Sequence, residues 1–149
     1  MKKKYYISCF ILLSCAATND LTILSFKTYD NITKKNYSYK VSVPNGFTFK
    51  EIENGGEWKE KRCEYSDNSI LYINDENSIP SVNYKNIETD SMSLRKCLTY
   101  KNDTLTVSGI DKQGKYWKNK KMKNINIGYL NVPKNKKEEF DRALSTIKQ

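Results

Sequence analysis

The cysteines carry the most distinctive chemistry of this chain, and they fall into two groups. Cys9 and Cys15 lie close together near the start of the sequence, whereas Cys63 and Cys97 lie within its body. A cysteine thiol can act as a nucleophile, a metal ligand or a disulfide partner. The chain contains no histidine, which excludes Ser-His-Asp and Cys-His catalysis and histidine-ligated metals.

The residues that precede Cys15 have the pattern of an export signal. Lysines at positions 2–4 come before Tyr5–Leu13, an apolar run of nine residues. This run is too short for a transmembrane helix, which needs about 20 residues, but it suits the core of a signal peptide, which has about 7–15. Leu-Leu-Ser-Cys at positions 12–15 ends the run.

A small residue directly before a cysteine, at the end of a short apolar run, resembles the lipobox of bacterial lipoproteins. The resemblance implies that the chain is cleaved before Cys15 and that an acyl-glyceryl group is attached to its thiol. Two or more acyl chains anchor a protein stably to a membrane. We therefore expect a signal peptide at 1–14, a lipidated tether at 15–20 and a single domain at 21–149. The alternatives are an ordinary secretory signal cut after Ala16 or Ala17, or a hydrophobic first strand.

Cys63 and Cys97 remain after Cys9 is removed with the signal and Cys15 takes the lipid. Two thiols in an exported domain most simply form one disulfide. Closing the loop between them would stabilise the fold by about 3–4 kcal/mol in the chain-entropy model. The alternative is two separate buried thiols. A zinc site is not expected, because the chain has no CxxC pair and no histidine.

A second chemical feature is the basic and aromatic segment Lys115–Met122. Its candidate surface-binding residues are Tyr116, Trp117, Lys118 and Lys120. Basic and aromatic side chains together are typical of nucleic-acid contacts. Strand alternation nevertheless separates Trp117 from the other three, and export removes the chain from nucleic acid. We therefore expect an ordinary solvated strand face for much of this segment; the alternative is contact of these residues with anionic lipid headgroups or an envelope polysaccharide, and we expect no nucleic acid.

The elements that must position these residues are mostly short strands. With 149 residues and a mean hydropathy of −0.76, the chain suits one domain and no membrane-spanning bundle. Alternating apolar residues and turn signals predict the strands. They cover Leu21–Lys27, Tyr37–Val43, Phe47–Ile52, Trp58–Tyr65, Ser69–Asn74, Thr104–Ile110, Lys115–Met122 and Ile125–Val132. The last three predict a β-meander, and the polar stretch Asp75–Asp90 predicts a long, candidate functional loop.

The end of the chain has helical periodicity. Lys134–Lys148 predicts a helix, with Asn135 and Glu138 spaced as a capping box. Its apolar stripe consists of Phe140, Ala143, Leu144 and Ile147. This stripe must be buried, because a single amphipathic helix of this length is marginal alone. The prediction is an α+β domain, in which an antiparallel sheet of seven or eight strands is packed by the C-terminal helix.

Two further resemblances concern the body of the chain. The sequences YKVSVPNGF and EEFDRALSTIK are similar to PsbP-like exported domains. SILYIND, NDTLTVSGIDKQGKYWK and IGYLNVP resemble a group of small, uncharacterised bacterial lipoproteins. These resemblances imply a fold and a location but no mechanism.

The functional prediction follows from the lipobox resemblance and from the lack of any catalytic signature. We expect a lipid-anchored, non-enzymatic protein of a Gram-negative cell envelope, in the outer membrane or facing the periplasm, without a cofactor or metal. Its domain would bind a partner protein, a toxin that it neutralises or an envelope glycan. The alternative is an accessory subunit of an envelope membrane complex, and a histidine-independent hydrolase ranks last.

Overall fold

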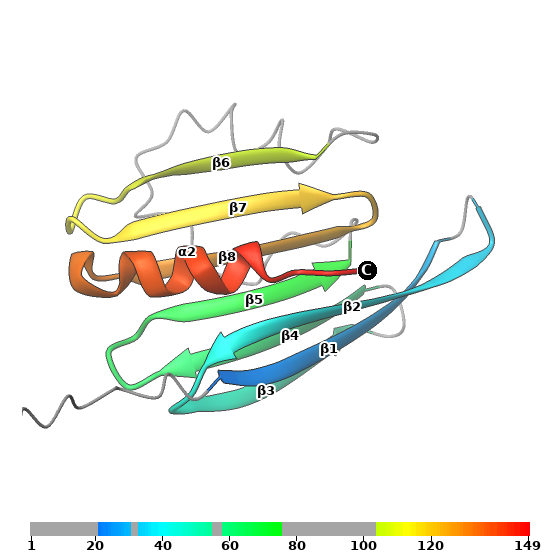
Figure 1. The fold of residues 1–149 in the computed structure, drawn as a ribbon, viewed down its shortest axis with the longest axis horizontal. Coiled ribbons are helices and arrows are strands. Elements are labelled where there is room, and N and C mark those ends of the chain that lie inside the picture. The colour runs from blue at the N-terminus through cyan, green and yellow to red at the C-terminus, as the bar shows by residue number, and fades with distance from the viewer. Residues whose placement is uncertain (1–20, 31–32, 55–57, 76–103) are drawn as a thin grey trace, which may run out of the picture.

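Eight strands and one C-terminal helix make up the part of the chain that the computed structural model describes (Figure 1). That part comprises residues 21–30, 33–54, 58–75 and 104–149. The strands are β1 (Leu21–Asp30), β2 (Lys35–Pro44), β3 (Phe47–Asn54), β4 (Trp58–Tyr65), β5 (Ile70–Asp75), β6 (Leu105–Ile110), β7 (Tyr116–Met122) and β8 (Ile125–Val132). The expected loop at Asp75–Asp90 lies outside these residues except for Asp75, which ends β5.

These strands form two antiparallel sheets instead of the single sheet of seven or eight strands that we expected. The hairpin β1–β2 stands alone, and the other strands pair in the order β3-β4-β5-β8-β7-β6. The meander β6-β7-β8 is confirmed, as is the hairpin β4–β5. A second meander, β3-β4-β5, joins it through the antiparallel pair β5–β8. The central pair of this sheet is therefore β5–β8, the paired strands that lie furthest apart in the sequence.

Strand alternation places one face of the hairpin in the core. Tyr39, Val41 and Val43 of β2 are fully buried, and Leu24 and Phe26 of β1 join them. β1 is longer than predicted and reaches Asp30, because its alternation continues through buried Thr28. The Tyr39 hydroxyl donates a 2.7 Å hydrogen bond to Asn124 Oδ1, which ties the hairpin to the turn before β8.

The helix is shorter than its apolar stripe. A 3-10 turn, η2 (Lys134–Lys136), leads into α2 (Lys137–Ser145). The expected capping box does not form: the N-cap of α2 is Lys136, and no side chain caps it. The last member of the stripe, Ile147, is buried beyond the helix end, where Lys148 exchanges backbone hydrogen bonds with Lys40 of β2.

The hydrophobic core contains residues of the hairpin, of one face of the six-stranded sheet and of α2. The Phe140 ring makes edge-to-face contacts with two tyrosine rings. The distance between ring centroids is 5.1 Å to Tyr65 and 5.7 Å to Tyr129. Residues of α2 approach β2 and β8, and Figure 1 shows the helix lying across β8 beside the hairpin. The inner surface of β6 and β7 lies beyond the helix, and it is there that the candidate site is found.

Candidate functional site: a groove between α2 and the meander

The predicted binding residues lie on both faces of β7. Tyr116, Lys118 and Lys120 are half-buried and share the face that carries the core, whereas Trp117 is 2% exposed and lies on the opposite face. Trp117 packs so closely on Gly109 of β6 that a Cβ there would lie 2.8 Å from the indole ring. Its side chain is therefore a packing element of the sheet, although it was expected among the surface-binding residues.

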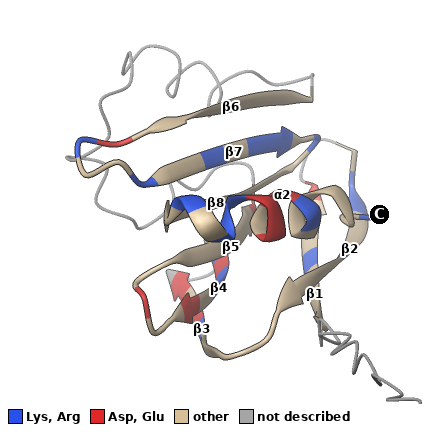
Figure 2. Ribbon diagram, turned by 60° about the vertical axis from the view of Figure 1, so that its left-hand side comes forward, with Lys and Arg blue, Asp and Glu red and all other residues tan. Residues whose placement is uncertain are grey.

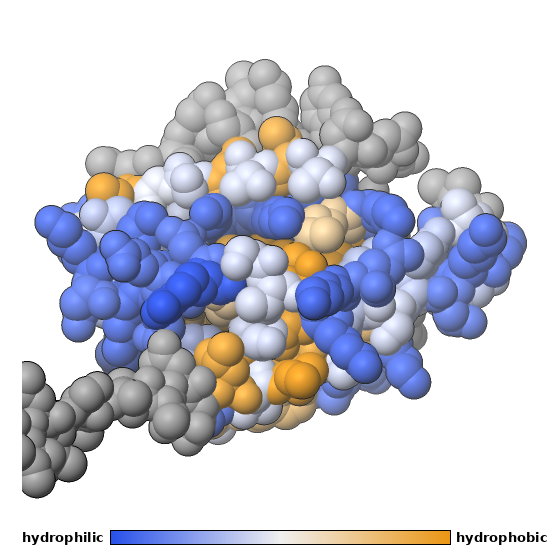
Figure 3. Space-filling view, viewed as in Figure 1, coloured by the Kyte–Doolittle hydropathy of each residue, from blue (hydrophilic) through white to orange (hydrophobic). Residues whose placement is uncertain are grey.

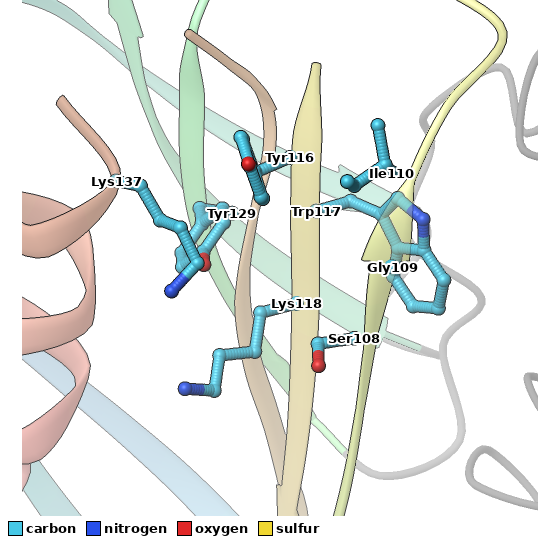
Figure 4. Close-up of a pocket in the computed structure, with 8 residues that line it drawn as sticks. All are labelled: Ser108, Gly109, Ile110, Tyr116, Trp117, Lys118, Tyr129 and Lys137. Carbon is cyan, nitrogen blue, oxygen red and sulfur yellow. The ribbon is translucent and has the colours of Figure 1, made fainter. Parts of the chain in front are cut away.

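Tyr116 and Lys118 line a shallow groove of about 140 Å³ beside α2 (Figure 4). Ser108 and Ile110 of β6 form its outer side, and Tyr129 of β8 forms its floor. Lys137 of α2 forms the other side, and Gly109 and Trp117 complete the lining. We call this feature the groove. Lys120 is on the same face of β7 but is not among the lining residues.

A single carboxylate organises the cations of the groove. Asp141 Oδ1 accepts a hydrogen bond from Lys118 Nζ at 2.8 Å and another from the Tyr129 hydroxyl at 3.1 Å. Its other oxygen accepts one from Lys137 Nζ at 2.6 Å. Two lysines therefore share one aspartate, and this cluster carries one net positive charge. Basic residues follow β7 where it passes α2 (Figure 2).

The protonation of the cluster follows from these contacts. Burial raises the pKa of Asp141, but hydrogen bonds from Lys118 and Lys137 outweigh it, so the net shift is downward. The hydrogen bond that Lys137 donates to Asp141 raises the pKa of Lys137. Burial, followed by the charge of Asp141, raises the pKa of the Tyr129 hydroxyl. The raised pKa of Lys137 favours its cationic form, which suits it to bind an anion and not to abstract a proton.

Aromatic rings accompany these charges. Lys137 Nζ lies 5.7 Å from the centroid of the Tyr116 ring, within the range of a cation–π contact. At the open side of the groove, Ile110 is 51% exposed. A ligand in the groove would meet ammonium groups, phenol rings and an aliphatic rim.

Sequence reasoning found three residues that line the groove, Tyr116, Trp117 and Lys118, but it missed the side of the groove that α2 forms. The spacing of Lys137 and Asp141, four residues apart on the expected helix, is a usable signal for an ion pair. Nothing in the sequence indicated that Asp141 would also meet a lysine of β7. That contact depends on where the helix crosses the sheet.

The opposite face of the six-stranded sheet carries a buried polar row, which the sequence analysis also missed. Glu60, Asn74, Asn126 and Lys121 are neighbours in register across β4, β5, β8 and β7, and each is at most 1% exposed. Glu60 pairs with Arg62 at 2.6 Å and accepts a hydrogen bond from Asn74 Nδ2 at 3.2 Å. Within the part of the chain that the structure describes, neither amide atom of the Asn126 side chain has a hydrogen-bond partner.

The cysteine predictions are only partly accessible to the structure. Cys63 is fully buried on the core face of β4 and has no disulfide partner among the described residues, and burial raises the pKa of its thiol to about 12. Cys15 and Cys97 lie outside the described residues, so lipid attachment and the expected disulfide remain predictions.

Among the residues that the structure describes, no cluster of histidine, cysteine, aspartate or glutamate side chains could hold a metal ion. No described helix is long and apolar enough to cross a membrane.

Comparison with known proteins found no matching family model, no similar curated protein and no similar solved structure. The functional argument therefore depends on the residues of this chain.

Proposed function

We propose that this chain is a lipid-anchored cell-envelope protein whose domain binds acidic groups of an envelope glycan in the groove, without enzymatic activity. The observation that supports the binding role is the sharing of Asp141 by Lys118 and Lys137. Each lysine retains donor capacity beyond its single bond to Asp141, because an ammonium group has three donors. An incoming carboxylate, phosphate or sulfate would accept the remaining hydrogen bonds.

A glycan fits the groove better than a small enclosed ligand does. The groove is shallow and lies between strands and helix on an accessible side of the domain. The faces of Tyr116 and Tyr129 offer apolar surface beside the two ammonium groups, and a sugar ring can contact such surface while its acidic group pairs with a lysine. The proposal also includes packing of α2 against the sheet, supported by the contact of Phe140 with Tyr129.

The anchor is the second part of the proposal, and it is supported by the sequence Leu-Leu-Ser-Cys at 12–15. Cys15 precedes β1 by six residues, so an acylated Cys15 would hold the domain close to the membrane. Intact-mass analysis of membrane-extracted protein should show a chain that starts at Cys15 and carries the mass of a diacylglycerol. The Cys15→Ala variant should appear in the soluble fraction; a variant that stays in the membrane would overturn the anchor.

The groove is tested by binding to polygalacturonate, an acidic polysaccharide, with uncharged dextran as the reference. We expect Lys118→Gln and Lys137→Gln each to weaken polygalacturonate binding by about threefold to tenfold, as for one lost charged hydrogen bond. Lys134→Gln is the matched control, since it removes an exposed charge of η2 outside the groove. Equal losses in all three variants would indicate nonspecific attraction and contradict a site in the groove.

A protein partner is the second candidate function, and exposed Ile110 at the rim of the groove favours it. Protein interfaces commonly have an apolar centre with charges at the edge. Stable co-purification with a membrane complex, lost in Ile110→Ser but kept in Lys118→Gln, would favour an accessory subunit over a glycan-binding protein.

A further inference from the structure

The hairpin β1–β2 has a second apolar surface, directed away from the core. Leu21 is 47% exposed and Ile23 is 66% exposed, whereas Leu24 and Phe26 fill the inner face of the same strand. Because the inner face is already packed, the two outer side chains are not needed for the core. Figure 3 shows apolar surface at the lower edge of the domain, over the beginning of β1.

The rest of this outer face is basic and aromatic. Along β1 it continues through Ser25 and Lys27 to Tyr29, which is 49% exposed. In register, Ser25 lies opposite Lys40 of β2, and both Lys27 and Lys40 are exposed. No aspartate or glutamate occurs in residues 21–29 or 35–44. The outer face is therefore apolar at one end, cationic in its middle and aromatic at the other end.

The apolar end is also the end at which the chain enters the domain. Six residue steps separate Cys15 from Leu21, and a fully extended chain spans at most about 3.6 Å per residue, or roughly 22 Å in all. An acylated Cys15 would therefore keep Leu21 within about 22 Å of the lipid headgroups, and Ile23, two residues further along, within about 29 Å. Lysines attract anionic headgroups, and tyrosine is enriched at the membrane interface.

We propose that the outer face of the hairpin β1–β2 lies on the membrane surface, with Leu21 and Ile23 inserted among the lipid headgroups and Lys27 and Lys40 paired with anionic lipids. This inference rests on the anchored form of the proposed function and adds an orientation to it. The groove is lined by residues of β6, β7, β8 and α2, so none of its lining residues belongs to the hairpin. The occupant is the bilayer, because the tether holds this face next to it.

Photocrosslinking of the full-length lipoprotein in vesicles tests the contact. The vesicles contain phosphatidylethanolamine and phosphatidylglycerol, and p-benzoylphenylalanine replaces Ile23. We expect a lipid-crosslinked product of increased mass at position 23. The matched control is Thr106, which is exposed on β6 at the far edge of the other sheet and should give at least tenfold less lipid adduct. A dimer band or an adduct with another protein at position 23 would overturn the proposal.

The charge contribution is tested in the same sample. Lys27→Gln with Lys40→Gln should lower the lipid adduct at position 23 several-fold at low ionic strength, and 0.5 M salt should lower the wild-type yield in the same direction. A yield that both changes leave unaltered contradicts the headgroup pairing.

Intact mass separates the two proposals. Protein that carries the diacylglycerol but gives no lipid adduct at position 23 contradicts the orientation and leaves the anchor standing. Protein without the diacylglycerol contradicts the anchor, and a position-23 adduct with added vesicles would then support membrane contact by the hairpin alone.

Discussion

Lys118 Nζ and Asp141 Oδ1 are 2.8 Å apart and join the middle strand of the C-terminal meander to α2. Both side chains are about three-quarters buried, at 29% and 25% exposure. The pair sits at the boundary between the packed core and the open groove. Its position makes the same contact relevant to stability and to binding.

Replacing Asp141 by asparagine should affect these two properties in opposite directions. Asp141→Asn removes the charge that both lysines share, so we expect the free energy of unfolding to fall by about 1 kcal/mol. Polygalacturonate should bind severalfold more tightly, since the lysines lose their internal anion. Urea denaturation and titration of the polysaccharide measure the two effects. Glu138→Gln, an equal charge change at an exposed residue of α2, is the control; tighter binding in that variant too would contradict the specific role of Asp141.

Asp67 should make stability depend on pH in the acid range. Burial opposes ionisation, but hydrogen bonds from Lys136 and Ser69 outweigh it and lower the pKa of Asp67 to about 2. The carboxylate therefore stabilises the fold fully above its unfolded pKa of 3.8, and this stabilisation is lost as the pH falls through about 2. Solvent screening limits the effect to about 1 kcal/mol.

The measurement is the urea midpoint from pH 5 to pH 2 for the wild type and for Asp67→Asn. The variant should be less stable at pH 5 and should lose less stability on acidification. Glu53→Gln, at a half-exposed ion pair with Lys59, should follow the wild type. Parallel curves for the wild type and Asp67→Asn would show that this carboxylate does not carry the acid dependence.

The sequence predicted the positions of the strands well, because burial follows alternation closely. β2, with Tyr39, Val41 and Val43 facing inward, is the clearest case. It did not predict that the strands divide into two sheets, since β1 could have paired with any strand edge. Only the β7 side of the groove was predicted, for a related reason. Local spacing indicates which residues share a strand face, but the helix that packs beside that face depends on tertiary structure. The buried polar row could not be predicted from the sequence, because its four residues come from four separate strands.

Cys63 should be chemically inert in the folded, reduced protein. Its side chain is fully buried and its pKa is raised to about 12, so almost no thiolate exists at neutral pH. Iodoacetamide should modify Cys63 only after the domain unfolds, and peptide mass spectrometry under reducing conditions follows the reaction. Rapid alkylation in the native state would contradict the described burial. The expected bridge to Cys97 is tested separately by a mass gain of two hydrogens when the exported protein is reduced.

Gly128 should not tolerate a side chain. Its position in β8 lies beneath the Tyr72 ring, and a Cβ there would come within 2.5 Å of the Tyr72 hydroxyl and closer still to the backbone oxygen of Lys118. The backbone cannot move aside without disrupting the pairing of β7 with β8. We expect Gly128→Ala to lower the free energy of unfolding by about 1–3 kcal/mol in urea denaturation. Ser108→Ala, on the exposed face of β6, should change it by less than about 0.5 kcal/mol.

The two asparagines of the polar row should respond differently to the same substitution. Asn126 has no side-chain hydrogen-bond partner among the described residues, so within them it bears the desolvation cost of a buried amide without compensation. Asn74 donates to Glu60 Oε2, and its loss leaves a buried carboxylate with one hydrogen bond fewer. We expect Asn126→Leu to raise the free energy of unfolding by about 1 kcal/mol and Asn74→Leu to lower it by about 1–3 kcal/mol. Leucine has the same branched arrangement of four side-chain heavy atoms as asparagine, and urea denaturation of both variants gives the two signs directly. A loss of stability in both would mean that Asn126 has a hydrogen-bonding partner, such as an ordered water molecule, in solution.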